Sequence, residues 1–232
     1  MAELDVIKSR AKQALTIRTV TGELDDFLWD RGQRLVCNVE QICRLPELSR
    51  IGQGIDHFCL TAATCFSDAG LARHLQAPKA EAVSMKSNVD GGELLDLSTE
   101  VVAEKLADVV EKSIIEKINR IITESGDHST QRAEAMILSD ARNLDDMGTT
   151  GIFNEFRRLI FAGKGISNIL LSWERKKDYR YWHARLNKSF RFEQVRKLAE
   201  QRLSAAERLM NQLKFETQAH DLKQSAVNSA FV

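Results

Sequence analysis

Apolar residues recur at intervals of three and four along most of this chain, which is the period of an α-helix. Asp96 or Ser98 would cap the start of one such helix in the middle of the sequence, and Gly126 follows its end. The alternation of apolar and polar residues that is typical of strands is almost absent. The pattern therefore predicts an all-α protein. The apolar stripe of the central helix consists of Val101, Leu106, Val109, Val110, Ile114, Ile118, Ile121 and Ile122.

The same periodicity predicts a single domain over residues 1–222, folded as a helical bundle, with a flexible tail over residues 223–232. Residues 166–186 are expected to form only short helical turns. The stretch 76–97 contains Pro78 and two adjacent glycines, so we interpret it as a loop within the domain. The expected helices cover residues 3–15, 24–44, 51–74, 98–124, 129–143, 150–162 and 189–217, and those at 51–66, 98–122 and 134–144 should line the core.

Charge and composition narrow the classes of function. The chain has 33 Lys and Arg residues against 33 Asp and Glu residues, so net charge does not favour nucleic acid or an anionic membrane as a partner. The N-terminus has no apolar signal core, and no run approaches the roughly 18 apolar residues of a membrane span. We expect a cytoplasmic protein without a membrane partner. The cysteines form no CxxC pair, which favours buried thiols over a disulfide scaffold or a zinc site: Cys37, Cys43, Cys59 and Cys65.

Three segments carry a resemblance to a known family. LTAATCFSDAGLA places Ser67 and Asp68 at the end of an apolar helix, and EAMILSDARNLDDMGTTGIF is an apolar helix that ends in Asp140 before a polar turn and Gly148. LAEQRLSAAERLMNQLKFE follows near the C-terminus. Together they resemble the HD superfamily of metal-dependent phosphohydrolases, over roughly residues 24 to 216. The resemblance implies an HD-type helical bundle.

In that family a first His, a His-Asp pair and a distant Asp hold a divalent metal ion, which activates water for attack on phosphorus. The resemblance places the distant Asp at Asp140 and the Asp of the pair at Asp68. Ser67 stands at the His position of the pair, and Arg31 stands where the first His is expected. The chain has no His before His57, so both imidazole ligands are missing. We expect Arg31 to occupy the place of the metal and to bond the carboxylates.

Each of these residues also has a plainer interpretation. Ser67 and Asp68 could bond the backbone at a helix end, and Asp140 could cap the turn that follows it. His128 could line the phosphate side of the pocket, or it could be an ordinary loop residue. We expect Asp145–Asp146 to face solvent.

Two further segments contain residues that bind phosphates in other proteins. Trp173–Phe192 interleaves Arg and Lys with aromatic residues. Such a mixture occurs on nucleic-acid surfaces, in cationic lids over phosphate clefts and on ordinary solvated surfaces, and the neutral net charge favours the last. Phe161–Ile169, FAGKGISNI, has two glycines around Lys164 but lacks both the longer pattern of an NTP-binding loop and a strand before it.

The resemblance, together with the absence of both His ligands of the metal, implies a degenerate HD-type protein without catalytic residues. Such a protein would act as a ligand-binding or protein-interaction module. Its remnant metal pocket would comprise Arg31, Ser67, Asp68 and Asp140, with no metal and no cofactor. The alternative is a phosphohydrolase for a nucleotide or another phosphoester, in which Asp68, Asp140 and His128 bind Mg²⁺ or Mn²⁺ weakly. A small phosphorylated ligand or another protein is the expected partner. Nucleic acid is not expected, and formation of a homo-oligomer stays open.

Overall fold

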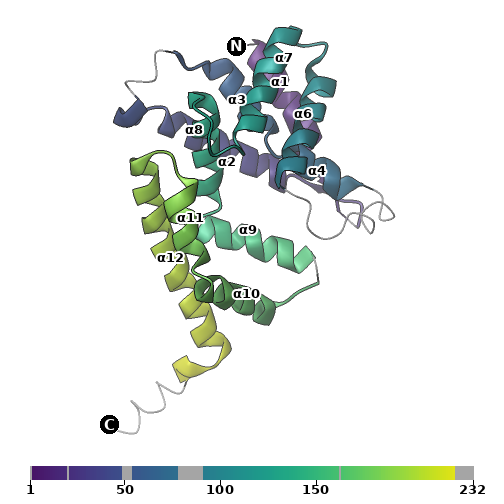
Figure 1. Cartoon of the computed structure of the whole chain (residues 1–232). Helices are drawn as coiled ribbons and strands as arrows, with labels where there is room; N and C mark the ends of the chain where they lie inside the picture. The colour runs from purple at the N-terminus through teal and green to yellow at the C-terminus, as the bar shows by residue number, and fades with distance from the viewer. Residues whose placement is uncertain (1, 20, 49–53, 78–90, 162, 223–232) are drawn as a thin grey trace. The chain divides into compact units, whose positions relative to one another are not determined.

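The computed structural model describes residues 2–19, 21–48, 54–77, 91–161 and 163–222. The fold is all-α, as predicted, and an all-α single-domain fold fits the chain (Figure 1). One short antiparallel hairpin, β1 (Ile17–Arg18) with β2 (Leu24–Asp25), was not expected from the sequence. None of the helices in the described ranges has the length and apolar character needed to cross a membrane.

Contacts along the chain divide it into two compact units, Met1–Arg142 and Asn143–Val232. The boundary falls near the end of helix α8 (Ala133–Asp145). The first unit also contains the hairpin and a 3₁₀ turn, η1 (Pro46–Leu48). Its other helices are α1 (Ala2–Leu15), α2 (Phe27–Ile42), α3 (His57–Phe66), α4 (Ala69–Gln76), α6 (Gly91–Leu106) and α7 (Lys112–Glu124).

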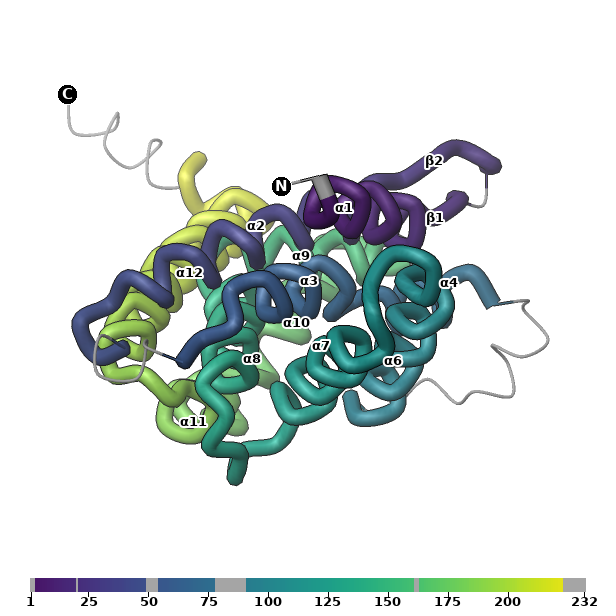
Figure 2. The backbone as a smooth tube through the Cα atoms, turned by 90° about the horizontal axis from the view of Figure 1, so that it is seen from above, coloured from purple at the N-terminus to yellow at the C-terminus, as the bar shows by residue number. Residues whose placement is uncertain are grey.

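Helix α3 lies at the centre of the first unit. It contacts α1, α2, α6 and α7, so it is surrounded by other helices (Figure 2). Its sequence explains this position, because Leu60, Ala63 and Phe66 are fully buried and small residues between them allow neighbouring helices to approach. The core therefore forms around the segment that ends in Ser67 and Asp68.

The second unit consists of α9 (Gly148–Phe161), α10 (Ile166–Asp178), α11 (Tyr181–Ser189) and α12 (Glu193–Thr217). Helix α12 contacts the other three. Trp173 of α10 and Trp182 of α11 are buried with their ring centroids 5.4 Å apart, so an aromatic pair joins these two helices.

Several predicted boundaries were wrong. The helix expected over 51–74 is divided into α3 and α4, and the helix expected over 98–124 is divided into α6 and α7. Residues 166–186, expected to be short turns, form two regular helices. Helix α6 begins at Gly91, inside the expected loop. The rest of that loop, 78–90, and the expected tail, 223–232, lie outside the described residues.

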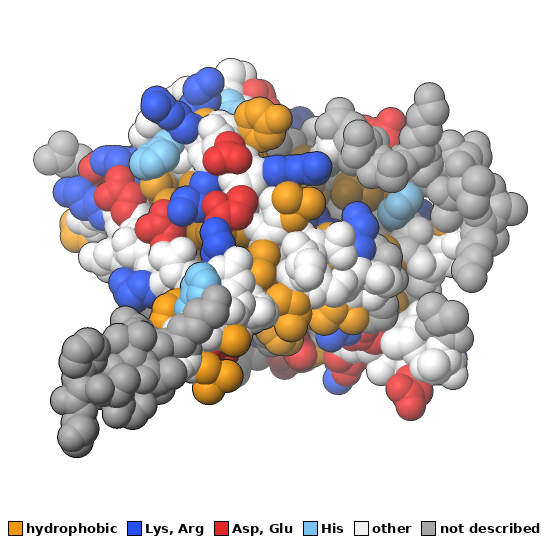
Figure 3. All heavy atoms as spheres, turned by 90° about the horizontal axis from the view of Figure 1, so that it is seen from below, with side chains coloured by type: hydrophobic (Ala, Val, Ile, Leu, Met, Phe, Trp, Pro, Cys, Tyr) orange, Lys and Arg blue, Asp and Glu red, His pale blue; other side chains and the backbone are white. Residues whose placement is uncertain are grey.

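Charges on the molecular surface are mixed. The face shown in Figure 3 carries acidic and basic side chains interspersed with one another and with hydrophobic ones. This distribution agrees with the equal numbers of acidic and basic residues in the sequence.

Candidate functional site

The break between α3 and α4 fixes the positions of Ser67 and Asp68. Ser67 follows the last residue of α3, and Asp68 precedes the first residue of α4. The hydroxyl of Ser98, on α6, accepts a hydrogen bond from the backbone N–H of Gly70 at 2.8 Å. A Cβ atom on Gly70 would lie 2.0 Å from the carbonyl oxygen of Leu94, so only glycine allows α4 to approach α6 this closely.

Asp68 is 4% exposed, and two arginines from other helices contact its carboxylate. Nη1 of Arg31, on α2, donates a hydrogen bond to Oδ2. Nη2 of Arg142, on α8, lies 3.5 Å from Oδ1. The side chain of Arg31 is 10% exposed and that of Arg142 is 27% exposed, so the cluster is largely removed from water.

The sequence of α2 explains why Arg31 reaches this position. Leu28 and Leu35 lie three residues before and four residues after Arg31, and both are buried. Residues at this spacing share one face of a helix, so Arg31 belongs to the face that packs on the core. Burial of an unpaired guanidinium would be unfavourable, and the Asp68 carboxylate compensates it.

The plainer interpretation holds for Ser67. Its hydroxyl donates to the carbonyl oxygen of Thr64 at 3.0 Å, within the last turn of α3. Asp68 differs, because its side chain makes no capping hydrogen bond to the backbone of α4. Its carboxylate instead meets the two guanidinium groups.

Asp140 is completely buried, but α8 does not end there. The helix continues to Asp145, so the interpretation of Asp140 as a cap for the next turn was wrong. His128 lies between α7 and α8 and is exposed, in contrast to Asp68 and Asp140. Among the residues with described positions, no group of three or more His, Cys, Asp and Glu side chains is placed to hold a metal ion. The alternative set Asp68, Asp140 and His128 is therefore not gathered as a metal centre in this structure.

The expectation that Asp145 faces solvent was wrong. Asp145 is 2% exposed, and its Oδ2 accepts a hydrogen bond from Asn154 at 3.3 Å. Asp146 is half-buried and accepts a hydrogen bond from Nη2 of Arg185 at 2.8 Å. Burial alone would lower the pKa of Arg185, but Asp146 and Tyr181 outweigh it and raise that pKa.

Sequence reasoning missed Arg142 as a member of the cluster. The available signal was its place two residues after Asp140, as a charged side chain in a helix with many apolar positions. The prediction that the cysteine thiols are buried was correct for Cys59 and Cys65, whereas Cys37 is exposed. Burial raises the pKa of Cys59 to about 12 and that of Cys65 to about 11.

No family model and no curated protein matches this sequence. Two crystal structures of Bacillus subtilis YpgQ resemble the fold. The selenomethionine form is 18% identical, with a TM-score of 0.60 over 93% of this chain and 94% of that chain. The complex with ADP is also 18% identical, with a TM-score of 0.58 over 93% and 95%. At this identity the similarity shows a shared fold across nearly the whole chain.

Proposed function

We propose that the protein is a degenerate HD-type protein without phosphohydrolase activity, which acts as a binding module for a small phosphorylated ligand. The observation that carries this proposal is the buried cluster in which Arg31 and Arg142 contact opposite oxygens of Asp68. A carboxylate that ligates a metal ion must offer a lone pair to it, and a nearby guanidinium competes for that lone pair and repels the ion.

The resemblance to the HD superfamily implies that Asp68 corresponds to a metal ligand. Its contacts with the two arginines give a physical reason why Asp68 would no longer bind a metal ion. Without a metal ion, the family's reaction has no activated water to attack phosphorus. The guanidinium of Arg31 is permanently charged, so it compensates Asp68 at every ordinary pH.

The comparison with YpgQ supports the choice of ligand. One of the two similar YpgQ structures is a complex with ADP, and the shared fold covers nearly all of both chains. A module that keeps the fold but loses the metal could keep a phosphorylated ligand without cleaving it. The sequence also leaves open a module that binds another protein instead of a small ligand.

Elemental analysis of the purified protein tests the first part of the proposal. We expect no stoichiometric Mn, Fe, Ni or Zn, and no hydrolysis of nucleoside phosphates or general phosphoesters when Mg²⁺ or Mn²⁺ is added. About one tightly bound metal ion per chain, lost in Asp68→Asn but kept in the exposed-carboxylate control Asp108→Asn, would overturn it. Turnover that disappears in Asp140→Asn would support the alternative phosphohydrolase.

Calorimetric titration with ADP in the absence of metal tests the second part. Saturable binding without turnover supports a phosphorylated ligand. No binding of ADP at millimolar concentration would contradict the extension from the YpgQ complex to this chain.

A further inference from the structure

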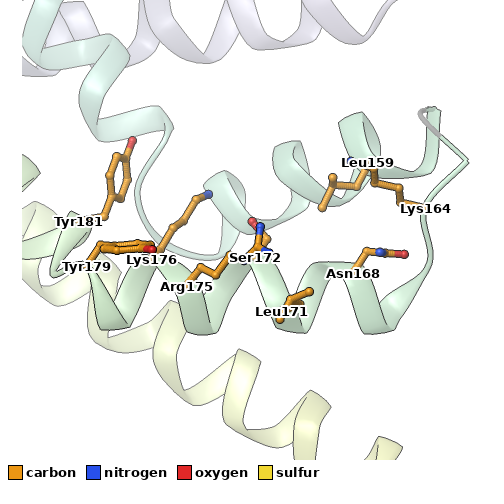
Figure 4. A pocket seen from close by; sticks show the side chains of 9 residues that line it. All are labelled: Leu159, Lys164, Asn168, Leu171, Ser172, Arg175, Lys176, Tyr179 and Tyr181. Carbon is orange, nitrogen blue, oxygen red and sulfur yellow. The ribbon is translucent and has the colours of Figure 1, made fainter. Parts of the chain in front are cut away.

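We propose that a groove between α9 and α10 binds a small organic anion that carries a planar ring. The groove has a volume of about 400 Å³ and lies wholly within the second unit (Figure 4). This volume is within the range of known small-molecule sites. Leu159 and Leu171 form part of its wall, so the groove offers apolar surface as well as charge.

Positive charge in the groove is only partly balanced. Lys164, Arg175 and Lys176 line it. Within the part of the chain that the structure describes, no acidic side chain pairs with Lys164 or Arg175. These two cations are therefore available to a negatively charged ligand, and a guanidinium can bond two oxygens of one phosphate or carboxylate.

Lys176 is held in place by its neighbours. Its ammonium lies 2.5 Å from Oε2 of Glu155, and Ser172 donates to Oε1 of the same carboxylate at 2.7 Å. The ammonium also lies over the ring of Tyr181, 5.7 Å from its centroid. Lys176 and Ser172 are thus positioned before any ligand arrives, which reduces the entropy lost on binding.

Two tyrosines provide stacking surfaces at the end of the groove where Arg175 and Lys176 lie. Tyr179 is 83% exposed and Tyr181 is 41% exposed, and both line the groove (Figure 4). Arg180, between them, has a left-handed backbone with a φ of 50°. This conformation is uncommon for a residue with a side chain. It turns the chain between α10 and α11, so two successive segments each contribute a tyrosine to the same groove.

The ligand class follows from this combination. A phosphate or carboxylate would be attracted to Arg175, with Lys164 adding positive charge at the opposite end of the groove, and a planar ring would pack on the tyrosine faces beside Arg175 and on leucine side chains. The groove also unites the two segments that the sequence analysis noted, since Lys164 comes from Phe161–Ile169 and Arg175 from Trp173–Phe192. The inference rests on the proposed function only in treating the protein as a binding module.

Titration of the full chain with phenyl phosphate tests the proposal, with inorganic phosphate and phenol as separate probes. We expect phenyl phosphate to bind at least tenfold more tightly than either fragment. The double variant Lys164→Ala/Arg175→Ala should weaken its binding tenfold or more. Lys188→Ala/Arg208→Ala removes two other exposed charges of the second unit and should leave the affinity within twofold.

Loss of affinity in Tyr179→Ala, with unchanged binding of inorganic phosphate, would support the stacking role. Equal affinity for phenyl phosphate and inorganic phosphate would overturn the requirement for a ring. Equal weakening in the two double variants, or no saturable binding of phenyl phosphate, would overturn the site. These outcomes are separable from the metal analysis, because none of the probes or variants involves Asp68.

Discussion

Arg31 and Asp68 form a buried ion pair between α2 and the start of α4, although they are 37 positions apart in the sequence. The pair connects α2, which packs against α3, with the segment that follows α3 in the chain. Burying both charges is costly, and their mutual attraction offsets much of that cost. Removal of one partner should therefore be far more damaging than replacement of both.

We predict that Arg31→Ala lowers the free energy of unfolding by about 3–5 kcal/mol, because the buried Asp68 carboxylate would lose its closer cationic partner. Chemical denaturation followed by circular dichroism measures this change. The control is Arg10→Ala, which removes an arginine from an exposed pair with Asp108 and should cost no more than about 1 kcal/mol.

A second substitution, made at Asp68, separates the effect of the lost ion pair on stability from the effect of the lost side-chain packing. Asp68→Asn in the Arg31→Ala background removes the carboxylate that has lost its closer partner and should restore part of the lost stability. If Arg31→Ala unfolds at the same denaturant concentration as the parent, the ion pair contributes nothing to stability and the prediction is wrong.

We also predict that Gly70→Ala destabilises the protein by about 1–3 kcal/mol, because the new methyl group would collide with the backbone of α6. The carbonyl oxygen of Leu94 and the N–H of Ser98 belong to a regular helix and have little freedom to move. Gly91→Ala is the matched control, since nothing lies within 4 Å of a Cβ atom there. Thermal unfolding that ranks the two variants in the opposite order would contradict this account.

The sequence predicted the all-α fold because helical periodicity is strong in most segments, as in the stripe that contains Ile118 and Ile122. It did not predict the division of 51–74 into α3 and α4. Most positions of α3 are buried, so apolar residues there do not reveal a helical face or its end. The close packing of α4 on α6 after this break involves Gly70 and Ser98, whose contact joins residues 28 positions apart.

The candidate site was partly predictable. The resemblance to the HD superfamily suggested that Arg31 approaches a carboxylate, and the structure places it against Asp68. The assignment of this cluster as a former metal pocket stays a prediction. Asp145 was misjudged because it stands beside a second carboxylate, Asp146, whereas in the structure it is buried and accepts a hydrogen bond from Asn154 of the next helix. Such tertiary partners leave no periodic signal in the sequence.

Ser98→Ala should lower the free energy of unfolding by about 1–3 kcal/mol, because the buried N–H of Gly70 would lose its hydrogen-bond acceptor. Thr99→Ala, in the neighbouring position, removes an exposed hydroxyl that bonds the carbonyl oxygen of Asp96, and it should have a much smaller effect. Comparison of the two denaturation curves checks the prediction, and similar losses in both variants would contradict it.

The final prediction concerns stability at alkaline pH. Burial raises the pKa of the Cys65 thiol from 9.0 to about 11. Below pH 9 the thiol is protonated in both the folded and the unfolded chain, so its full contribution to stability is present. Between pH 9 and pH 11 the unfolded chain releases this proton while the folded chain retains it, and stability is lost as pH rises.

Cys65→Ala should therefore reduce the steepness with which the free energy of unfolding falls between pH 9 and pH 11, by up to about 1.4 kcal/mol per pH unit. The slope, rather than the absolute stability, is the informative quantity, because the substitution also leaves a small cavity in the core. Cys37→Ala, which removes an exposed thiol, is the control for the loss of a cysteine outside the core. An unchanged slope in Cys65→Ala would show that the folded protein does not hold this thiol in its neutral form.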